Sequence, residues 1–243
     1  IAAGTVLDPD AFSICLPAAC AVELTHSASL VLDDLPSMDD AALRRGRPCV
    51  HLAFPQWAVD MVPGFLVTMA FGICLDSNSV SAERRIAATI ELSRAGLRMA
   101  HGQESDVTQP AEAITEGALV ERYRLKTGAL FAAAAGSGAI LCGAAPSEAR
   151  ALSEAGMAMG IAYQIADDIA DRVARPETVD KSVNRDLARV TFMDLFGSEG
   201  AGRRADCYRQ EALGFLDAFG PEACLFRLLI TEAGRGASRL AFV

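Results

Sequence analysis

The sequence predicts an all-α fold, a single large bundle of long antiparallel helices around a central cavity. Three observations point to it. The chain is 51% hydrophobic but only 6% aromatic, and its apolar residues are mostly Ala, Leu, Val and Ile, of which Ala and Leu are strong helix formers. Alternating Val/Ile/Thr runs and Asn-Gly or Asp-Gly hairpin turns are missing. No linker divides the 243 residues, so 1–243 is predicted to be one domain.

Short Gly, Pro, Asp and Ser punctuation separates five long helical runs. The first leads into an acidic cluster, and the second is the most apolar. The third and fifth begin at serines suited to capping a helix, and the fourth is rich in Ala. These runs cover residues 10–32, 51–75, 81–106, 112–143 and 147–171, and shorter helices are expected at 190–196, 200–219 and 222–240.

The most apolar run, 57–75, is almost long enough to span a membrane. It contains Asp60 and the pair Pro63-Gly64, so we interpret it as a core helix buried on most sides. We therefore expect no permanent membrane anchor. Residues 1–10 also lack the basic stretch of a signal peptide.

Charge and cysteine content exclude several classes of function. The net charge is −9 and the pI about 4.9, which disfavours nucleic-acid binding because that needs a basic surface. An anionic substrate would need locally concentrated positive charge or recruited cations. The seven cysteines form no C-x-x-C pair, so we expect buried free thiols in a reducing cytoplasm. With only three histidines, a zinc site is not expected.

Two acidic clusters each follow an apolar helical run. They are DDLPSMDD at 33–40 and DDIAD at 167–171. Asp167 and Asp171 are four residues apart, so their carboxylates share a helix face and repel. They also lie at the negative end of the helix dipole. Mg²⁺ offsets such repulsion because it prefers oxygen ligands. One cluster alone fits a solvated helix end, but the pair predicts a metal site.

Basic residues accompany both clusters. Arg offers phosphate a planar fork and Lys a point charge, and in an acidic protein such neighbours predict diphosphate clamps. For Arg47 and Arg185 an ordinary solvated role is an equal alternative. The basic residues near the clusters or in the middle of the chain are Arg44, Arg45, Arg47, Lys126, Lys181 and Arg185.

These motifs resemble those of the trans-type polyprenyl diphosphate synthases, particularly the bacterial geranylgeranyl diphosphate synthases of carotenoid pathways. The resemblance runs from about residue 17 to about residue 197. Its pieces are HSASLVLDDLPSMDDAALRRGRP at 26–48, GQESD at 102–106, LKTGALF at 125–131, YQIADDIAD at 163–171, and a G-K-x-x-x-x-D-x-x-x-x-x-T-like segment at 181–192.

The resemblance implies an isoprenoid synthase fold, a homodimer and a head-to-tail prenyltransferase. Such an enzyme condenses isopentenyl diphosphate with an allylic diphosphate to give an all-trans prenyl diphosphate. It also implies three Mg²⁺ ions, with Mn²⁺ as a substitute, on six carboxylates: Asp33, Asp34, Asp39, Asp167, Asp168 and Asp171.

The other roles that the resemblance implies concern the two substrates and the reaction centre. The allylic diphosphate would be clamped by Arg44, Lys126 and Lys181. His26 and Arg45 would contact isopentenyl diphosphate. Thr127 and Gln164 would line the reaction centre and steady the carbocation.

The chemistry fits these roles. The allylic C–O bond breaks, and metals and Lys/Arg stabilise the charge that develops on the leaving diphosphate. The double bond of isopentenyl diphosphate attacks the cation, and the departed diphosphate removes a proton. The cavity must exclude water, which would quench the cation as an alcohol.

Product length is expected to depend on the depth of the cavity below the first motif. The residue five before Asp33 is Ala28, followed by Ser29. Both are small, and in the family a small residue here lets the chain grow past farnesyl. We therefore expect geranylgeranyl diphosphate. Deeper residues that could set the floor of the cavity include Phe54, Trp57 and Phe65.

Three features depart from the family pattern. The Gly-Gly-Lys-x-x-Arg motif that grips isopentenyl diphosphate is expected before Ile1 and is missing from this sequence. Pro63-Gly64 stands where many members have Gly-Asp. Asp180 and Arg189 replace a Gly and a Lys in a segment suited to act as a lid.

Two other functions remain open. A class I terpene cyclase would also use Mg²⁺ on an all-α fold, but cyclases usually carry an Asn/Ser/Glu triad where this chain has Asp167–Asp171. A non-catalytic partner subunit of a synthase would have lost motif aspartates, and here all six are present. A purely structural acidic bundle is the least favoured interpretation.

Overall fold

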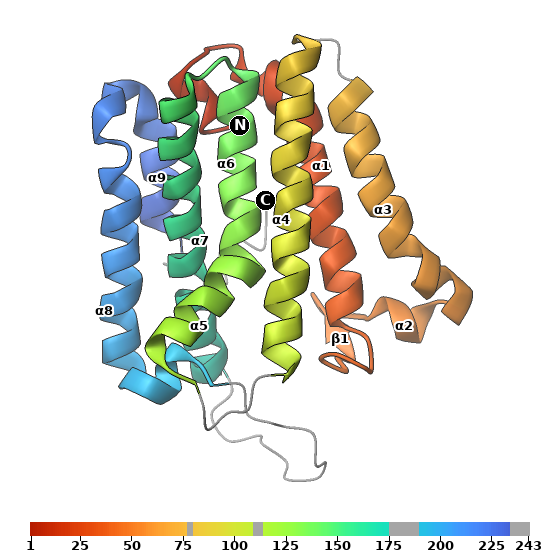
Figure 1. The fold of residues 1–243 in the computed structure, drawn as a ribbon. Coiled ribbons are helices and arrows are strands. Elements are labelled where there is room, and N and C mark those ends of the chain that lie inside the picture. Colours follow the sequence, from red (N-terminus) through yellow and green to blue (C-terminus); the bar gives the residue numbers. More distant parts are fainter. Residues whose placement is uncertain (77–79, 109–113, 175–189, 234–243) are drawn as a thin grey trace.

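The computed structural model describes residues 1–76, 80–108, 114–174 and 190–233, which form a helical bundle (Figure 1). Three long helices run in one direction, downward in Figure 1: α1 (Ala11–Asp33), α4 (Ala82–Thr108) and α7 (Pro146–Ala174). The predicted all-α class is confirmed. Because these three helices run the same way, their C-terminal ends lie at the same end of the bundle.

Three helices run in the opposite direction. They are α3 (Gln56–Asp76), α6 (Ala129–Leu141) and α8 (Phe192–Gly214), which is bent at Gly197, whose φ of 67° is non-helical. Helix α6 lies between α4 and α7, and α3 and α8 lie at the outer edges of the bundle. Thr191 and Asp194 form a capping box at the start of α8. The remaining short helices are a 3₁₀ turn at Gly4–Val6, α2 (Val50–Ala53), α5 (Glu116–Tyr123), a 3₁₀ segment at Asp217–Ala223 and α9 (Cys224–Glu232).

The predicted helix at 51–75 is broken near its start. Pro55 forces the preceding residue out of the helical region, and Phe54 is extended, with φ −130° and ψ 157°. A short hairpin also lies before α2. Its strands have two residues each, and β1 (Leu43–Arg44) pairs with β2 (Arg47–Pro48). Its turn, Arg45-Gly46, has positive φ at both positions, as a type I′ turn requires. This hairpin was not predicted because its turn is Arg-Gly, whereas Asn-Gly and Asp-Gly are the strong hairpin signals.

The predicted helix at 112–143 contains a π-helical turn. It begins at α5, where the Thr115 hydroxyl accepts the N–H of Ala118 at 3.2 Å. The π-helical turn Arg124–Gly128 then joins α5 to α6. Single π turns inside α-helices occur frequently at functional sites, and this one carries Lys126 and Thr127.

The core is built around α6, which is buried on nearly every side and consists largely of Ala and Gly. Small side chains let α4 and α7 pack closely against it. The hydroxyl of Ser137 also donates to the carbonyl of Ala88 on α4 at 3.2 Å. The largest fully buried apolar side chains are Leu92, Leu119, Leu152, Ile161, Ile165, Phe192, Leu216 and Ile230.

Helix α3 is not the buried core helix that its composition predicted. It packs along α1 and α4, but its outer face is exposed: Trp57 is 69% and Phe65 58% accessible. By length and composition alone, α1 and α3 could each cross a membrane, with only 28% and 22% of their most apolar windows buried; this is weak evidence for a span.

The prediction of buried thiols was right for Cys15, Cys49, Cys74 and Cys142. It was wrong for the other three, which are free but exposed on helix surfaces: Cys20, Cys207 and Cys224. Apolar neighbours in sequence did not place these thiols in the core because each lies on the outer face of its helix.

Candidate active site

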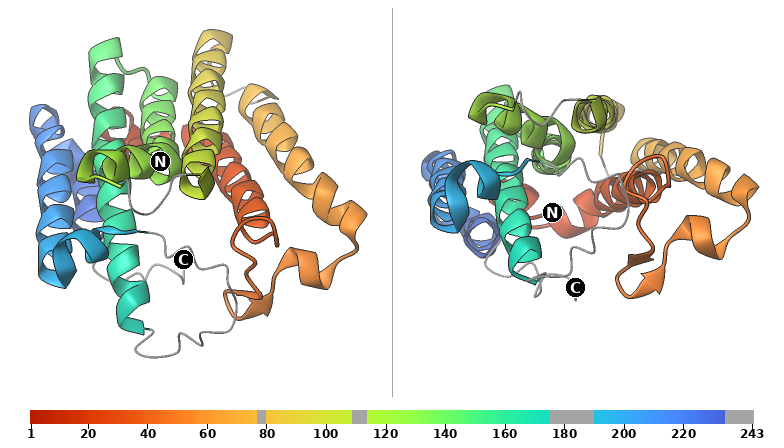
Figure 2. Two further views of the ribbon diagram at one scale, coloured as in Figure 1. Left: turned by 60° about the horizontal axis from the view of Figure 1, so that its bottom comes forward. Right: turned by 90° about the horizontal axis from the view of Figure 1, so that it is seen from below.

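The predicted site residues gather at one end of the bundle. The acidic clusters lie at the C-terminal ends of α1 and α7, and the GQESD motif ends α4. Figure 2, with this end turned toward the viewer, shows α1 and α7 apart and the ends of α4 and α5 along one side. The up-down order of the helices thus brings together motifs more than a hundred residues apart, Asp33 and Asp167 among them.

The first acidic cluster contains an ion pair between the buried Asp34 and the half-buried Arg44. Arg44 Nε lies 3.0 and 2.8 Å from the two oxygens of Asp34, and Nη2 lies 2.7 Å from Oδ1. Burial alone would raise the pKa of Asp34, but the hydrogen bonds from Arg44 and Cys49 hold it below its ordinary value. The sequence analysis placed Asp34 on the metal and Arg44 on the diphosphate. In the structure they bind each other, because the hairpin returns Arg44 over the helix end.

The loop after α1 is also tied back to the helices. The N–H of Asp39 donates to the carbonyl of Asp33 at 2.9 Å, which holds the first and last aspartates of the motif close together. Gln103 Nε2 on α4 lies 3.6 Å from Met38 Sδ in the loop. Of the described motif residues, Asp39, Arg45 and Arg47 are exposed and Asp33 is half-buried.

His26 lies two helical turns before Asp33 on α1. Its pKa is lowered, chiefly by burial and also by the positive charges of Arg45 and Arg44. Burial and the carboxylate of Asp167 raise the pKa of Tyr163 on α7, and the charge of Arg45 acts in the opposite direction. The charge of Arg45 therefore acts on His26 of α1 and on Tyr163 of α7.

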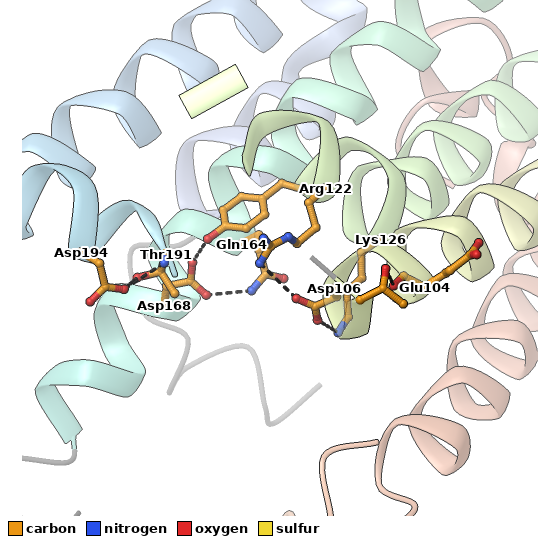
Figure 3. Close-up of polar contacts among 10 residues, drawn as sticks. Glu104, Asp106, Arg122, Lys126, Gln164, Asp168, Thr191 and Asp194 are labelled. Carbon is orange, nitrogen blue, oxygen red and sulfur yellow. Dashed lines mark hydrogen bonds and ion pairs between the residues drawn. The ribbon is translucent and has the colours of Figure 1, made fainter. Parts of the chain in front are cut away.

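Lys126 on the π-helical turn forms a three-charge cluster with α4 and α5. Its Nζ lies 2.7 Å from Asp106 Oδ2, and Arg122 Nη1 lies 3.1 Å from Asp106 Oδ1. Figure 3 shows Asp106 between the two cations. The motifs predicted no role for Asp106, although it ends GQESD, and none for Arg122. The signal was available, since Arg122 stands four residues before Lys126, one turn away on the same helical face.

Two glycines allow the π-helical turn to lie this close to its neighbours. A Cβ on Gly102 of α4 would lie 2.5 Å from the backbone N and 2.8 Å from the Cα of Lys126. A Cβ on Gly160 of α7 would lie 2.8 Å from the Cα of Gly128. The turn is therefore clamped between α4 and α7 by backbone contacts that any larger residue would prevent.

A chain of hydrogen bonds links the turn to the second acidic cluster. Thr127 Oγ1 donates to Gln164 Oε1 at 2.7 Å, and Gln164 Nε2 donates to Asp168 Oδ1 at 3.0 Å. The Tyr123 hydroxyl donates to Asp168 Oδ2 (Figure 3). Both Asp168 oxygens thus accept hydrogen bonds from the protein. Each of these oxygens keeps a second lone pair, so the role of Asp168 as a metal ligand stays a prediction. The sequence analysis also missed Tyr123, three residues before Lys126.

The other two aspartates of the second cluster suit a divalent cation. The pKa of Asp167 is raised by burial and by the carboxylate of Asp171, so a nearby cation would favour its charged form. Among the described residues no group of three His, Cys, Asp or Glu side chains could hold a metal alone. That matches Mg²⁺, which is usually bound by one or two carboxylates together with substrate phosphates.

The Asp168 carboxyl makes metal-free stability pH-dependent. Burial, opposed by hydrogen bonds from Tyr123 and Gln164, raises its pKa to about 6, so the folded state holds this proton more tightly than the unfolded state. Its contribution is therefore favourable at low pH and is lost as pH rises from about 4 to about 6, by about 3 kcal/mol.

The prediction concerns the free energy of unfolding in EDTA of the wild type and of Asp168→Asn. The value for the wild type minus the value for the variant should fall by about 3 kcal/mol between pH 4 and 7. Chemical denaturation at each pH measures it. Asp206→Asn, a change to an exposed carboxylate on α8, should show no such trend. A pH-independent difference for Asp168→Asn would contradict the assignment.

Two predicted residues lie apart from these clusters, and four others lie outside the described residues. Ala28 is buried in the packed face of α1, and Ser29 donates its hydroxyl to the carbonyl of His26 at 2.8 Å. Neither lines the cavity of about 140 Å³ that lies between α1 and α6, whose walls include Cys15, Val22 and Ser137. Residues placed outside the described part of the chain are Asp180, Lys181, Arg185 and Arg189.

Comparison with known proteins gives this site a context. A curated geranylgeranyl diphosphate synthase from Pseudescherichia vulneris is 38% identical over 191 residues, which cover 78% of this chain and 61% of that protein. The chain thus spans less than two thirds of the length of this relative.

Solved structures match over most of the chain. A farnesyl/geranylfarnesyl diphosphate synthase from Zymomonas mobilis aligns with a TM-score of 0.82 and 28% identity, covering 96% of this chain and 80% of that one. A Helicobacter pylori geranyltransferase, solved with magnesium and isoprenyl diphosphate, aligns with a TM-score of 0.78 and 27% identity, covering 94% and 79%. The polyprenyl synthetase family model matches residues 1–197. Fold, motifs and matches agree that the chain belongs to the polyprenyl synthetase family.

Proposed function

We propose that the protein is a trans-prenyltransferase that condenses isopentenyl diphosphate with an allylic diphosphate, forming geranylgeranyl diphosphate. One observation carries the proposal. The two acidic clusters, Lys126 and the Thr127–Gln164 pair all lie at one end of a bundle whose interior is apolar. Ionising an allylic diphosphate needs charge stabilisation away from water, and this end of the bundle offers carboxylates and cations next to an apolar interior.

We propose that Mg²⁺ is the cofactor, as in the magnesium-containing Helicobacter pylori neighbour. Asp33 at the end of α1 and Asp39 in the loop after it would hold it together with Asp167 and Asp171 on α7. When bound, Mg²⁺ neutralises charge on the leaving diphosphate. Three ions, with Mn²⁺ as a substitute, remain the expectation from the resemblance. Asp34 and Asp168 support this set by holding Arg44 and Gln164.

Other side chains bind the two substrates and stabilise the carbocation. Lys126 presents its ammonium to the allylic diphosphate, while Asp106 fixes its direction. Arg45 and His26 face the second diphosphate, and the positive charge of Arg45 lowers the pKa of His26. Thr127 and Gln164 place two oxygen atoms beside the cationic carbon, where their partial negative charge favours it. Electrons from the broken C–O bond stay on diphosphate, and the proton lost after C–C bond formation goes to that same anion.

An assay with and without isopentenyl diphosphate separates this proposal from its rivals. The full-length protein is incubated with Mg²⁺ and dimethylallyl, geranyl or farnesyl diphosphate in turn. Elongation consumes the allylic substrate only when isopentenyl diphosphate is present, and it yields a longer diphosphate. A terpene cyclase would consume it without isopentenyl diphosphate and release an extractable hydrocarbon or alcohol. Consumption under neither condition would favour a non-catalytic partner subunit and contradict the proposal.

We propose that the protein acts as a homodimer through the outer face of α3 and α4. On α3, Trp57, Met61, Phe65 and Met69 are four residues apart and 52–69% exposed. On α4 the exposed apolar residues include Ile86, Ile90 and Leu97. An uncharged stripe complements an identical stripe in a two-fold dimer, and an exposed face of this kind usually marks an interface.

Light scattering after size exclusion tests the dimer. The wild type should elute as a dimer, and the double variant Trp57→Glu/Phe65→Glu as a folded monomer, because two buried, unpaired carboxylates oppose association. Phe12→Glu changes an equally exposed apolar residue on α1 and should leave the dimer intact. A monomeric wild type, or a dimeric double variant, would rule out this surface.

A further inference from the structure

Arg122 is a charged residue that the protein buries next to the proposed diphosphate site. Its side chain is only 5% exposed, as is that of its partner Asp106. Burying a guanidinium is costly unless it is paired, and Asp106 supplies the pair at 3.1 Å. Because Arg122 lies one turn before Lys126, both cations reach the same carboxylate, each through a different oxygen (Figure 3).

The charge balance of this cluster depends on Arg122. Asp106 and Lys126 alone would form a neutral pair, which would attract an anion weakly. With Arg122 included, the three side chains carry a net charge of +1. Lys126 is 26% exposed and the other two are 5% exposed, so the cluster presents its excess charge to the outside through the Lys126 ammonium.

We propose that Arg122 is a positioning residue that offsets the charge of Asp106, so that Lys126 stays oriented by Asp106 yet attracts the diphosphate with its full positive charge. The inference rests on the proposed function, since it assigns a diphosphate to the site. Arg122 itself does not touch the substrate. It acts through the shared carboxylate, and the positive field it adds also reaches the neighbouring Tyr123.

Four proteins separate charge from structural support. We count each charged side chain of the cluster as one unit of charge. The cluster is then neutral in Arg122→Met and carries +1 in the wild type. It also carries +1 in the double variant Asp106→Asn/Arg122→Met, and +2 in Asp106→Asn. The affinity for inorganic diphosphate with Mg²⁺, measured by titration calorimetry, should follow this order. We expect Arg122→Met to bind about tenfold more weakly than wild type, as is typical when a supporting partner of a binding group is lost.

The double variant should bind within about threefold of wild type, and Asp106→Asn at least as tightly as wild type, although each single variant removes one member of the buried Arg122–Asp106 pair and lowers the melting temperature. Arg122→Lys should retain most of the affinity because it keeps the charge. In turnover, Arg122→Met should raise KM for the allylic diphosphate more than it lowers kcat. Arg203→Met, at an exposed arginine on α8, is the matched control and should change nothing.

A purely structural Arg122 predicts the opposite pattern, in which affinity follows stability: both single variants bind weakly and the double variant is no better. That result would overturn the inference. If Arg122→Met does not fold, Asp106→Asn must still bind more tightly than the double variant. If the wild type elongates prenyl diphosphates but Arg122→Met has the same affinity for diphosphate and the same KM for the allylic substrate, only the inference is refuted. A wild type that neither binds diphosphate nor elongates refutes the proposed function as well.

Discussion

Replacement of Asp167 by Asn should lower kcat for prenyl transfer by about a thousandfold, the effect typical of losing one preorganised electrostatic contact to a transition state. The metal-free protein should remain at least as stable as the wild type. Asp167 is half-buried, and its pKa is raised by burial and by Asp171, so its negative charge opposes folding until a cation arrives. The same substitution therefore removes activity without removing stability.

Steady-state elongation rates and thermal unfolding in EDTA measure the two effects on the same samples. Mg²⁺ should raise the melting temperature of the wild type in the presence of diphosphate, and this rise should shrink in Asp167→Asn. Asp206→Asn, at an exposed carboxylate on α8, controls for loss of one negative charge. Full activity in Asp167→Asn would remove α7 from the proposed metal site.

Replacement of Gly102 by Ala should lower activity by about a hundredfold, since displacing a reacting group by about 1 Å costs roughly that much. The added methyl would lie 2.5 Å from the Lys126 backbone N. Backbone cannot rotate away as a side chain can, so the π-helical turn must move, and Lys126 and Thr127 move with it. We also expect a loss of stability of about 1–3 kcal/mol from overpacking.

Gly96 provides the matched control on the same helix. A Cβ there would meet nothing within 4 Å, so Gly96→Ala should keep full activity and add up to about 1 kcal/mol of stability from helix propensity. Activity and melting temperature of the two variants measured side by side decide the matter. Equal activity in both would show that the position of the turn does not depend on the Gly102 contact.

The long helices and acidic clusters were predictable because they depend on local sequence. Residues 33–40 and 167–171 each follow an apolar run and end a helix, as expected. The exposure of α3 was not predictable in this way. Its composition is that of a core helix. Whether Trp57 and Phe65 are covered, however, depends on which elements pack against α3.

The contacts within the site were harder to predict because they depend on tertiary placement. No spacing rule pairs Asp34 with Arg44, since the hairpin that brings them together relies on positive φ at Arg45 and Gly46. Likewise, the DDIAD motif predicts Asp168 only as a metal ligand. Only the fold shows Tyr123 and Gln164 occupying its two oxygens.

The most direct test of the account is the length and metal dependence of the product. The full-length protein is incubated with labelled isopentenyl diphosphate and farnesyl diphosphate, in Mg²⁺ or in EDTA, and the dephosphorylated products are chromatographed. The account predicts geranylgeraniol as the main product in Mg²⁺ and none in EDTA. Label that never enters a longer prenyl chain, or elongation that proceeds equally in EDTA, would contradict it.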